Sequence, residues 1–523
     1  MFLQRIGNRG LRLGSLFEQA ARHHPANVVI FDHDLEALPD VGRRTTVAEL
    51  ADAVDALAAR LWAGGVRPGQ RVVVHKSDGF DIMLLACATA RIGGVPVLLS
   101  PTLDGATVAQ LVRRVGRPHL VTDEVKLTKD LPDTIIAETE RVLLVSGSHP
   151  DATELRQFTD APRVPAASVD PTLPALITHT SGTTGLPKLA VHTARSLQAR
   201  YRPQISVVTP VLRRRETVAI HVSFVHSRLV TALAIALNRG FPMLVLADSD
   251  PRHVGDLFAR YRPGILEAHP NSFMGWEELA GDPRRPLANV MLFSSTFDAI
   301  HPRTVHRMLR ASQRRFPLFG QLYGQSEVGP TVVRAFTRRR RIDDDGRCVG
   351  MPFPGMTGVR VVSRNGERPS ADSPGYIEVR SDGRAVTYLG EQERYDEQVH
   401  DGWWRMGDVG YRTRWGCLHL LDREVDLIEG FGSTLAVEDA LFGRLDEIAE
   451  IIVLPGPDGR AVPVVCTKND RPLDPRAWKR ATADLPPMAD PVQWRLADLP
   501  QTATTKIKRL ELARLLASPE SAR

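Results

Sequence analysis

Apolar runs typical of strands alternate with apolar residues at helical spacing along most of this chain of 523 residues, and this alternation constrains the fold more than any other feature. Residues 71–75, RVVVH, form a short apolar run typical of a buried strand. Residues 83–92 then repeat apolar side chains at helical spacing, and the same order of strand and helix returns from residue 216. Because strands that alternate with helices predict parallel, doubly wound sheets, the fold class that we expect is α/β.

The pattern changes to short strands and turns after Gly358, and a helix from about Val437 and the strand IIVLP follow. A chain of this length exceeds what one hydrophobic core normally serves. We therefore expect two domains. Residues 1–422 would form a large N-terminal domain, and residues 423–523 would form a small α+β domain.

Composition excludes several classes of protein. Lys and Arg number 67 against 61 Asp and Glu, so the net charge of +6 does not indicate nucleic-acid binding. The arginines at 338–341 are followed at once by aspartates at 343–345, which is typical of a solvated hairpin. No uncharged apolar run reaches the roughly 18 residues of a membrane span, and the N-terminus lacks the apolar core of a signal peptide. We expect a cytoplasmic protein with no membrane span and no nucleic-acid partner.

Residues 178–188, THTSGTTGLPK, are rich in hydroxyls and glycine and end in a cation. The segment is not a Walker motif, because Leu186 and Pro187 separate the glycine from Lys188. Its backbone N–H groups and hydroxyls nevertheless suit phosphate oxygens. The residues alone favour a phosphate loop, with an ordinary polar loop as the alternative.

Four further motifs follow in order: QLYGQSEVG at 321–329, WWRMGDVGY at 403–411, LLDREVDLI at 420–428 and LPQTATTKIKR at 499–509. Together with the first motif, this ordered set resembles the adenylate-forming superfamily of acyl-CoA synthetases, adenylation domains and luciferases. The resemblance covers almost the whole chain. It implies a large domain of doubly wound sheets plus a distorted β-barrel, and a mobile C-terminal domain that acts as a lid.

The resemblance implies an ATP site. Tyr323 matches the aromatic residue that stacks on adenine, and Asp408 and Arg423 match the residues that contact the ribose. The implied ATP-binding residues are Thr180, Ser181, Gly182, Thr183, Thr184, Gly185, Lys188, Tyr323, Gly324, Asp408 and Arg423.

Three residues are implied in catalysis. Ser326 matches a hydroxyl near the α-phosphate, Glu327 matches the ligand of Mg²⁺, and Lys506 matches the catalytic lysine of the C-terminal domain. Attack of a carboxylate on ATP brings an anion to a polyanion, so the barrier is mainly electrostatic and positioned cations lower it. The family's reaction is the formation of an acyl-adenylate with release of pyrophosphate.

The substrate pocket departs from that of amino-acid-activating members, which carry an aspartate in the segment matching SFVHS at 223–227. This segment contains no aspartate, which favours an aryl, cinnamate-like or aliphatic acid as the substrate. His226 either bonds to the substrate or is a core histidine, and Phe297 either shortens the pocket or packs against neighbouring structure. The expected pocket residues are Phe224, His226, Ser227, Thr296 and Phe297.

Three hypotheses for the function remain open. CoA is the commonest acceptor in such chains, but Glu429 departs from the pattern of CoA-using members, and Val425 departs from the family's hinge pattern. A second hypothesis replaces CoA by an amine or by a separate carrier protein acting in trans, or starts from an unusual small anion such as nitrite. A third is a nucleotide-binding module without catalysis, against which the intact acidic and basic motif residues argue.

Overall fold

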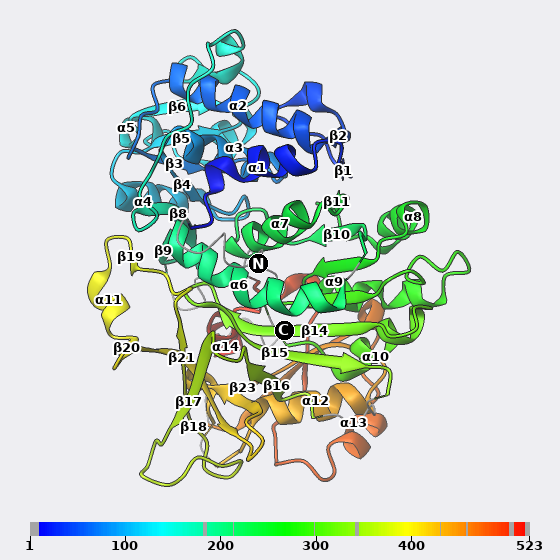
Figure 1. The fold of residues 1–523 in the computed structure, drawn as a ribbon. Coiled ribbons are helices and arrows are strands. Elements are labelled where there is room, and N and C mark those ends of the chain that lie inside the picture. Colours follow the sequence, from blue (N-terminus) through cyan, green and yellow to red (C-terminus); the bar gives the residue numbers. More distant parts are fainter. Residues whose placement is uncertain are drawn as a thin grey trace.

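The structure is a computed structural model that describes residues 10–180, 186–212, 214–297, 299–339, 345–428, 430–456, 459–501 and 507–517. Its strands form three sheets with helices packed around them (Figure 1). Most helices precede or follow a strand that we expected from the sequence. None of the helices in the described ranges is both long and apolar enough to cross a membrane.

The largest sheet combines a parallel half with an antiparallel half. Strands β1, β10, β11, β12, β13 and β14 pair in parallel, which confirms the α/β expectation, and β14 pairs antiparallel with β15. The strands expected in a distorted barrel continue this same sheet. In spatial order the sheet contains β17 (Thr357–Val362), β18 (Gly375–Ser381), β21 (Trp403–Arg412), β22 (Leu418–Arg423), β16 (Cys348–Pro352), β15 (Gly329–Thr337), β14 (Leu318–Gln325), β13 (Leu292–Ser295), β12 (Ile265–Ala268), β10 (Val218–His221), β11 (Met243–Val245), β1 (Val28–Phe31) and β2 (Arg44–Thr46), and β20 (Val399–His400) pairs with β21.

The second sheet has eight strands and carries the segment that resembles a phosphate loop. Its strands are, in spatial order, β19 (Thr387–Tyr388), β9 (Leu189–Thr193), β8 (Pro174–His179), β4 (Val95–Leu98), β3 (Arg71–Val74), β5 (His119–Thr122), β6 (Arg141–Leu144) and β7 (Thr153–Glu154). The connection between the antiparallel strands β8 and β9 is the glycine-rich segment.

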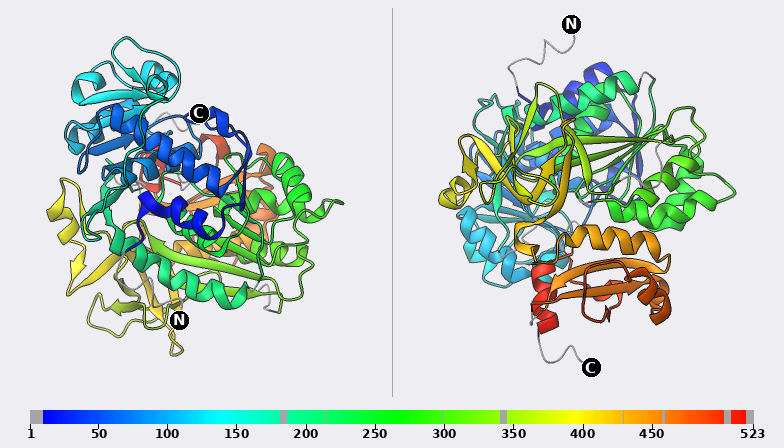
Figure 2. Two further views of the ribbon diagram at one scale, coloured as in Figure 1. Left: turned by 45° about the horizontal axis from the view of Figure 1, so that its top comes forward. Right: turned by 90° about the horizontal axis from the view of Figure 1, so that it is seen from below.

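The C-terminal part has a small sheet of its own, formed by β23 (Ile448–Pro455), β24 (Ala461–Thr467) and β25 (Val492–Gln493). Two hydrophobic clusters lie on it, one including Val437 and Leu441 and the other including Leu512. Figure 2 (right) shows this part, in orange and red, at one side of the larger body.

Helices cover the sheets of the larger body. The helices of the chain are α1 (Leu16–His23), α2 (Val47–Ala63), α3 (Asp81–Arg91), α4 (Gly105–Val115), α5 (Ile135–Glu138), α6 (Ala194–Val211), α7 (Ser227–Arg239), α8 (Pro251–Tyr261), α9 (Pro270–Gly275), α10 (Pro302–Ala311), α11 (Gln392–Asp396), α12 (Thr434–Arg444), α13 (Pro475–Ala481) and α14 (Arg509–Ala517).

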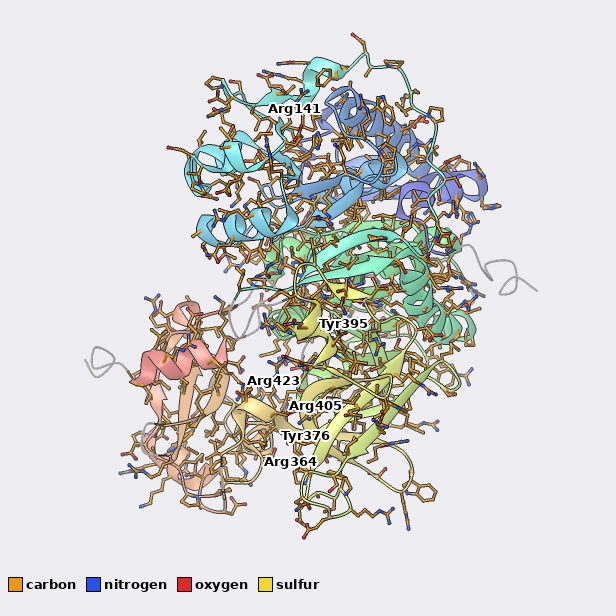
Figure 3. All side chains as sticks on the ribbon, turned by 90° about the vertical axis from the view of Figure 1, so that its left-hand side faces the viewer. Arg141, Arg364, Tyr376, Tyr395, Arg405 and Arg423 are labelled. Carbon is orange, nitrogen blue, oxygen red and sulfur yellow. The ribbon has the colours of Figure 1, made fainter. Side chains whose placement is uncertain are left out.

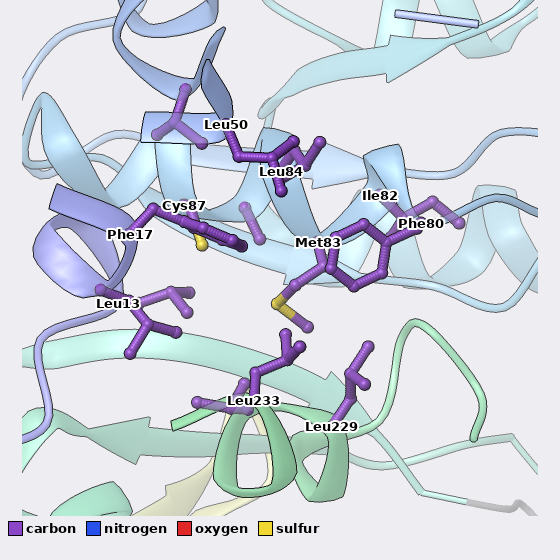
Figure 4. Packing of buried hydrophobic residues seen from close by; sticks show 14 of the residues in the cluster. Leu13, Phe17, Leu50, Phe80, Ile82, Met83, Leu84, Cys87, Leu229 and Leu233 are labelled. Carbon is purple, nitrogen blue, oxygen red and sulfur yellow. The ribbon is translucent and has the colours of Figure 1, made fainter. Parts of the chain in front are cut away.

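Helix α7 is fixed by the core between the two large sheets. Its Leu229 and Leu233 are fully buried in one cluster with Met83 of α3 and Phe17 of α1. Figure 4 shows these side chains facing one another across the contact between α3 and α7. Because protein interiors are close-packed, this contact sets the rotation of α7 about its axis. The N-terminal end of α7 is thereby held at the cleft described next.

Candidate functional site

A cleft of about 590 Å³ lies between the larger body and the C-terminal part. Residues from β14, β21, β22 and the start of α7 line one side, and Glu438, Ile451 and Ile507 line the other. Eight residues implied by the motifs lie on its wall: Thr180, Lys188, Tyr323, Gly324, Ser326, Glu327, Asp408 and Arg423. Segments far apart in the sequence therefore meet at one site.

The glycine-rich segment starts and ends at the cleft. The backbone N–H of Thr180 donates to the carbonyl of Lys188 at 2.9 Å, and the N–H of Lys188 donates to Thr180 Oγ1 at 3.3 Å. Ser181, Gly182, Thr183, Thr184 and Gly185 lie between them, outside the described residues. These two bonds hold both ends of the segment at the cleft wall.

Lys188 is held beside an acidic and an aromatic side chain. Its Nζ donates to the Tyr388 hydroxyl at 3.3 Å, and that hydroxyl donates to Glu327 Oε1 at 2.5 Å. Lys188 Nζ lies 3.9 Å from the same carboxylate oxygen. Burial lowers the pKa of Lys188, and burial together with Glu327 raises the pKa of Tyr388. A cation and a carboxylate therefore face the cleft side by side, as an ion-bridged polyphosphate requires.

The turn between β14 and β15 is anchored by Arg200, which sequence reasoning missed. Arg200 of α6 donates from Nη2 to the carbonyls of Ser326 and Glu327, at 2.9 and 2.8 Å. It also donates to the carbonyl of Gly383 at 2.6 Å and to Ser227 Oγ at 2.9 Å. Burial lowers its pKa to about 10, so it remains a cation at neutral pH. The position of the turn thus depends on a residue more than a hundred positions away.

His226 is neutral and points at Ser326. Its Nδ1 accepts from the backbone N–H of Arg228 at 3.0 Å, and its Nε2 lies 3.1 Å from Ser326 Oγ. Since Nδ1 is an acceptor, the ring proton is on Nε2 and is donated to the serine oxygen. His226 also lines the cleft, so it belongs to the cleft wall beside Ser326.

The two residues expected at the ribose lie on neighbouring strands. Asp408 of β21 pairs with Arg423 of β22, and Arg423 Nε is 3.9 Å from Asp408 Oδ1. The Tyr323 hydroxyl donates to Asp408 Oδ2 at 2.6 Å. Burial and the Asp408 carboxylate raise the pKa of Tyr323 well above its usual range. Figure 3 shows Arg423 between the C-terminal part and these strands.

Asp408→Asn should weaken ATP binding by about 1.5–3 kcal/mol, or roughly 10- to 150-fold in Kd, because the ribose hydroxyls lose a charged acceptor. The loss is measured by titrating ATP against the intact protein. Asp396→Asn, on the exposed side of α11 and outside the cleft, is the matched control. An ATP affinity that stays the same in Asp408→Asn would contradict the ribose role.

Gly324 has no room for a side chain. A Cβ there would lie 2.0 Å from the carbonyl oxygen of Gly329, across the irregular pairing of β14 with β15. Glycine at this position therefore allows the turn that carries Ser326 and Glu327 to close.

The rings of His226 and Phe297 line the cleft, His226 next to Ser326, and His269 packs against Phe297 from outside the cleft lining. The ring of Phe297 lies 4.7 Å from that of His226 and 4.3 Å from that of His269, centroid to centroid. Phe297 has φ +86°, which is costly for a bulky residue, by about 1–3 kcal/mol. Strain of this kind persists only where surrounding contacts hold it, so the rings form a fixed wall.

The expected pocket residues separate into two groups. Ser227, Thr296 and Phe297 line the cleft with His226, but Phe224 does not. Phe224 is buried in the core, with ring centroids 5.5 Å from His33 and 5.9 Å from Phe80. The prediction for Phe224 was wrong because the chain turns after β10, where the N–H of His226 donates to the carbonyl of Ser223 at 3.2 Å, so no regular period decides which side chains face the cleft. Ser223 and Val225 line the cleft instead.

The expected catalytic lysine, Lys506, lies outside the described residues. The next residue, Ile507, lines the cleft, as does Arg509. Arg509 Nη2 donates to the Glu438 carboxylate at 2.7 and 2.8 Å, and its Nε lies 3.7 Å from Asp426. These contacts hold the start of α14 near the β22 end of the cleft.

Comparison with known proteins identifies a family and several relatives. A family model described as AMP-binding enzyme matches residues 16–389. A 3-amino-2-hydroxy-4-methoxybenzoate diazotase from Streptomyces cremeus is 48% identical over 97% of this chain and 96% of its own length. A 3-aminoavenalumate diazotase from a Streptomyces species is 27% identical over 79% of this chain and 74% of its own length.

Solved structures show the same fold. An anthranilate CoA ligase in complex with anthranoyl-AMP superposes with a TM-score of 0.81 at 18% identity, over 97% of this chain and 98% of that one. A benzoate CoA ligase from Burkholderia xenovorans LB400 gives a TM-score of 0.78 at 19% identity, over 96% of this chain and 99% of that one.

Proposed function

The chain belongs to the family of AMP-binding enzymes and is an adenylate-forming enzyme, and from this premise we propose that it activates nitrite with ATP and converts an aromatic amine into a diazonium ion. Of the hypotheses drawn from the sequence, this is the one that starts from a small anion. The diazotases among its relatives support it, because a diazonium group needs a second nitrogen at the oxidation level of nitrite.

The proposed reaction balances without an external oxidant. A nitrite oxygen attacks the α-phosphorus of ATP, the bond from that phosphorus to the bridging oxygen breaks, and pyrophosphate leaves. The amine nitrogen then attacks the nitrosyl nitrogen, AMP leaves and the amine loses a proton. The N-nitroso compound tautomerises to a diazohydroxide, which takes up a proton and loses water. Amine, nitrite and ATP thus give diazonium, AMP, pyrophosphate and one water.

The observation that carries the proposal is the wall of rings beside Ser326. His226 and Phe297 line the cleft there with ring centroids 4.7 Å apart, and His269 supports Phe297 from outside the cleft lining at 4.3 Å. In the family's pattern the residue that matches Ser326 marks the position of the α-phosphate. A crowded wall at that point favours a nucleophile of three atoms over a carboxylate with a bulky substituent. An aromatic amine takes the place of CoA as the acceptor, and no carrier protein is required.

Mg²⁺ would be held by Glu327 together with phosphate oxygens of ATP. Magnesium at phosphoryl-transfer sites is usually bound by one or two carboxylates plus substrate phosphates. The donor set fits this mode, because the described part of the chain has no group of three His, Cys, Asp or Glu side chains that could form a separate cage. Lys188, 3.9 Å from Glu327, would neutralise a further phosphate charge.

We also propose that the chain divides near Asp422 into residues 1–422 and a mobile lid, 423–523. The contacts of Thr434 with Asp422 and of Arg509 with Asp426 support a pivot at this point. Burial raises the pKa of Asp422 to about 6. In the lid, Lys506 would approach the nitrite and the α-phosphate during the first step.

Phe297→Gly tests the role of the wall. We expect the wild-type protein to catalyse ATP–pyrophosphate exchange with nitrite and not with benzoate. Glycine adopts the positive φ at this position without strain, and the substitution removes the ring from the cleft wall. The variant should therefore gain ATP–pyrophosphate exchange with benzoate. Phe316→Gly, an exposed phenylalanine outside the cleft, is the control and should keep the wild-type selectivity. Wild-type exchange with benzoate and none with nitrite would overturn the proposed function.

A further inference from the structure

Arg228 has a hydrogen-bond donor group that nothing in the described chain satisfies. The residue is 6% exposed, lines the cleft and lies in the first turn of α7. Its Nε donates to Glu267 Oε1 of β12 at 2.7 Å. Its Nη1 is buried and has no partner among the described residues. Because buried polar groups in native proteins are nearly always paired, this nitrogen indicates the place of a ligand oxygen.

The surroundings of Arg228 favour an anion. Glu267 balances the charge of Arg228. Among the described residues, the hydrogen bonds of the nearby Arg200 go to neutral oxygens, which are the backbone carbonyls of Gly383, Ser326 and Glu327 and the hydroxyl of Ser227. Ser227 Oγ links Arg200 to the first residue of α7. The N-terminal end of this 13-residue helix adds partial positive charge. Glu327 offsets part of the charge of Arg200 and Lys188, so three cations stand against the two carboxylates Glu267 and Glu327, and the remaining positive charge attracts a carboxylate.

Arg228 and His226 bond to different elements of the site. His226 precedes α7 and bonds to Ser326, whereas Arg228 in the first turn of α7 bonds to Glu267 of β12. The cleft wall that includes Arg228 also includes Met274 and Ile300, which are apolar and suit the face of an aromatic ring. An aromatic acid is therefore a suitable ligand for this cleft, with its anion at Arg228 and not at Ser326, to which His226 bonds.

We propose that Nη1 of Arg228 binds the ring carboxylate of an aminoarenecarboxylate, so that the amine of the same ring is directed toward Ser326. This inference rests on the proposed function and names the substrate class of that site. Arg228 would select for the carboxylate, because a guanidinium binds carboxylates more strongly than it binds neutral oxygens.

The test compares two probes of the same shape, 3-aminobenzoate and 3-aminobenzamide, titrated by calorimetry against the full chain with AMP present. We expect the wild-type protein to prefer the benzoate by roughly 10- to 150-fold, the range of a charge-assisted hydrogen bond. Arg228→Gln should abolish this preference, and Arg228→Lys should restore part of it. Arg239→Gln, at the far end of the same helix and outside the cleft, should keep the wild-type preference.

Binding needs neither nitrite nor turnover, so this result is independent of whether the protein makes a diazonium ion. If Arg228→Gln leaves Glu267 unpaired and fails to fold, the double variant Arg228→Gln/Glu267→Gln removes both charges and should show the same loss of preference. A benzoate preference that survives in these variants overturns the proposal. Loss of nitrite-dependent exchange with the benzoate preference intact also overturns it, because nitrite would then be the ligand of Nη1.

Discussion

Glu327→Gln is expected to slow nitrite-dependent ATP–pyrophosphate exchange by about 10²–10³-fold, the cost of removing one positioned charge-stabilising group. The carboxylate accepts the Tyr388 hydroxyl at 2.5 Å and lies 3.9 Å from Lys188 Nζ, on a turn that Arg200 holds by two carbonyls. Glutamine keeps the shape of the side chain but loses the charge that would bind Mg²⁺.

The control for this variant is Glu378→Gln. Glu378 of β18 is also buried and ion-paired, with Arg360 Nε donating to it at 2.7 Å, but it does not line the cleft. Exchange rates are measured at saturating ATP and Mg²⁺ after a thermal-shift comparison of both variants with the wild-type protein. Equal loss in the two variants would assign the effect to stability and remove the catalytic role of Glu327.

Lys506→Ala is expected to reduce the same first step by about 10²–10³-fold while ATP affinity stays within a few fold. The prediction rests on the resemblance of residues 499–509 to the motif with the catalytic lysine and on the place of the adjoining Ile507 on the cleft wall. A lysine that reaches the nucleophile and the α-phosphate stabilises charge that develops in the transition state, so rate falls and binding does not.

Lys508→Ala is the matched control, two residues away. Lys508 Nζ lies 3.1 Å from the carboxylate of Glu511 of α14, and Lys508 does not line the cleft. Removing this side chain should therefore leave ATP–pyrophosphate exchange intact. Single-turnover formation of pyrophosphate separates the first step from product release. A normal first step in Lys506→Ala would remove that residue from the mechanism.

Local patterns predicted the elements of the fold because each strand or helix carries its own hydrophobic period. Residues 71–75 and 83–92 fall on β3 and α3, with boundaries within two residues. The motif residues Tyr323 and Asp408 both lie on strands, β14 and β21, that bring them to one cleft. The order and spacing of residues were sufficient to predict these features, because a motif and a hydrophobic period each depend only on residues that are close together in the sequence.

Contacts between distant segments could not be predicted in this way. Tyr388 reaches Lys188 because β19 pairs with β9, and no motif marks the sequence around it. Arg200 lies in a helix whose sequence gives no sign that the guanidinium is buried against Gly383 and Ser326. Phe224 was misplaced because its segment is irregular after β10, so the side of the chain that faces the cleft was not fixed by period.

The most direct test of the central claim follows a nitrite oxygen into AMP. The full chain is incubated with ¹⁸O-labelled nitrite, ATP, Mg²⁺ and 3-aminobenzoate, and the AMP and the aromatic product are analysed by mass spectrometry. If nitrite attacks the α-phosphate, each AMP carries one ¹⁸O in its phosphate, and its amount equals that of the diazonium ion. Unlabelled AMP, or AMP formed at the same rate without nitrite, would contradict the account.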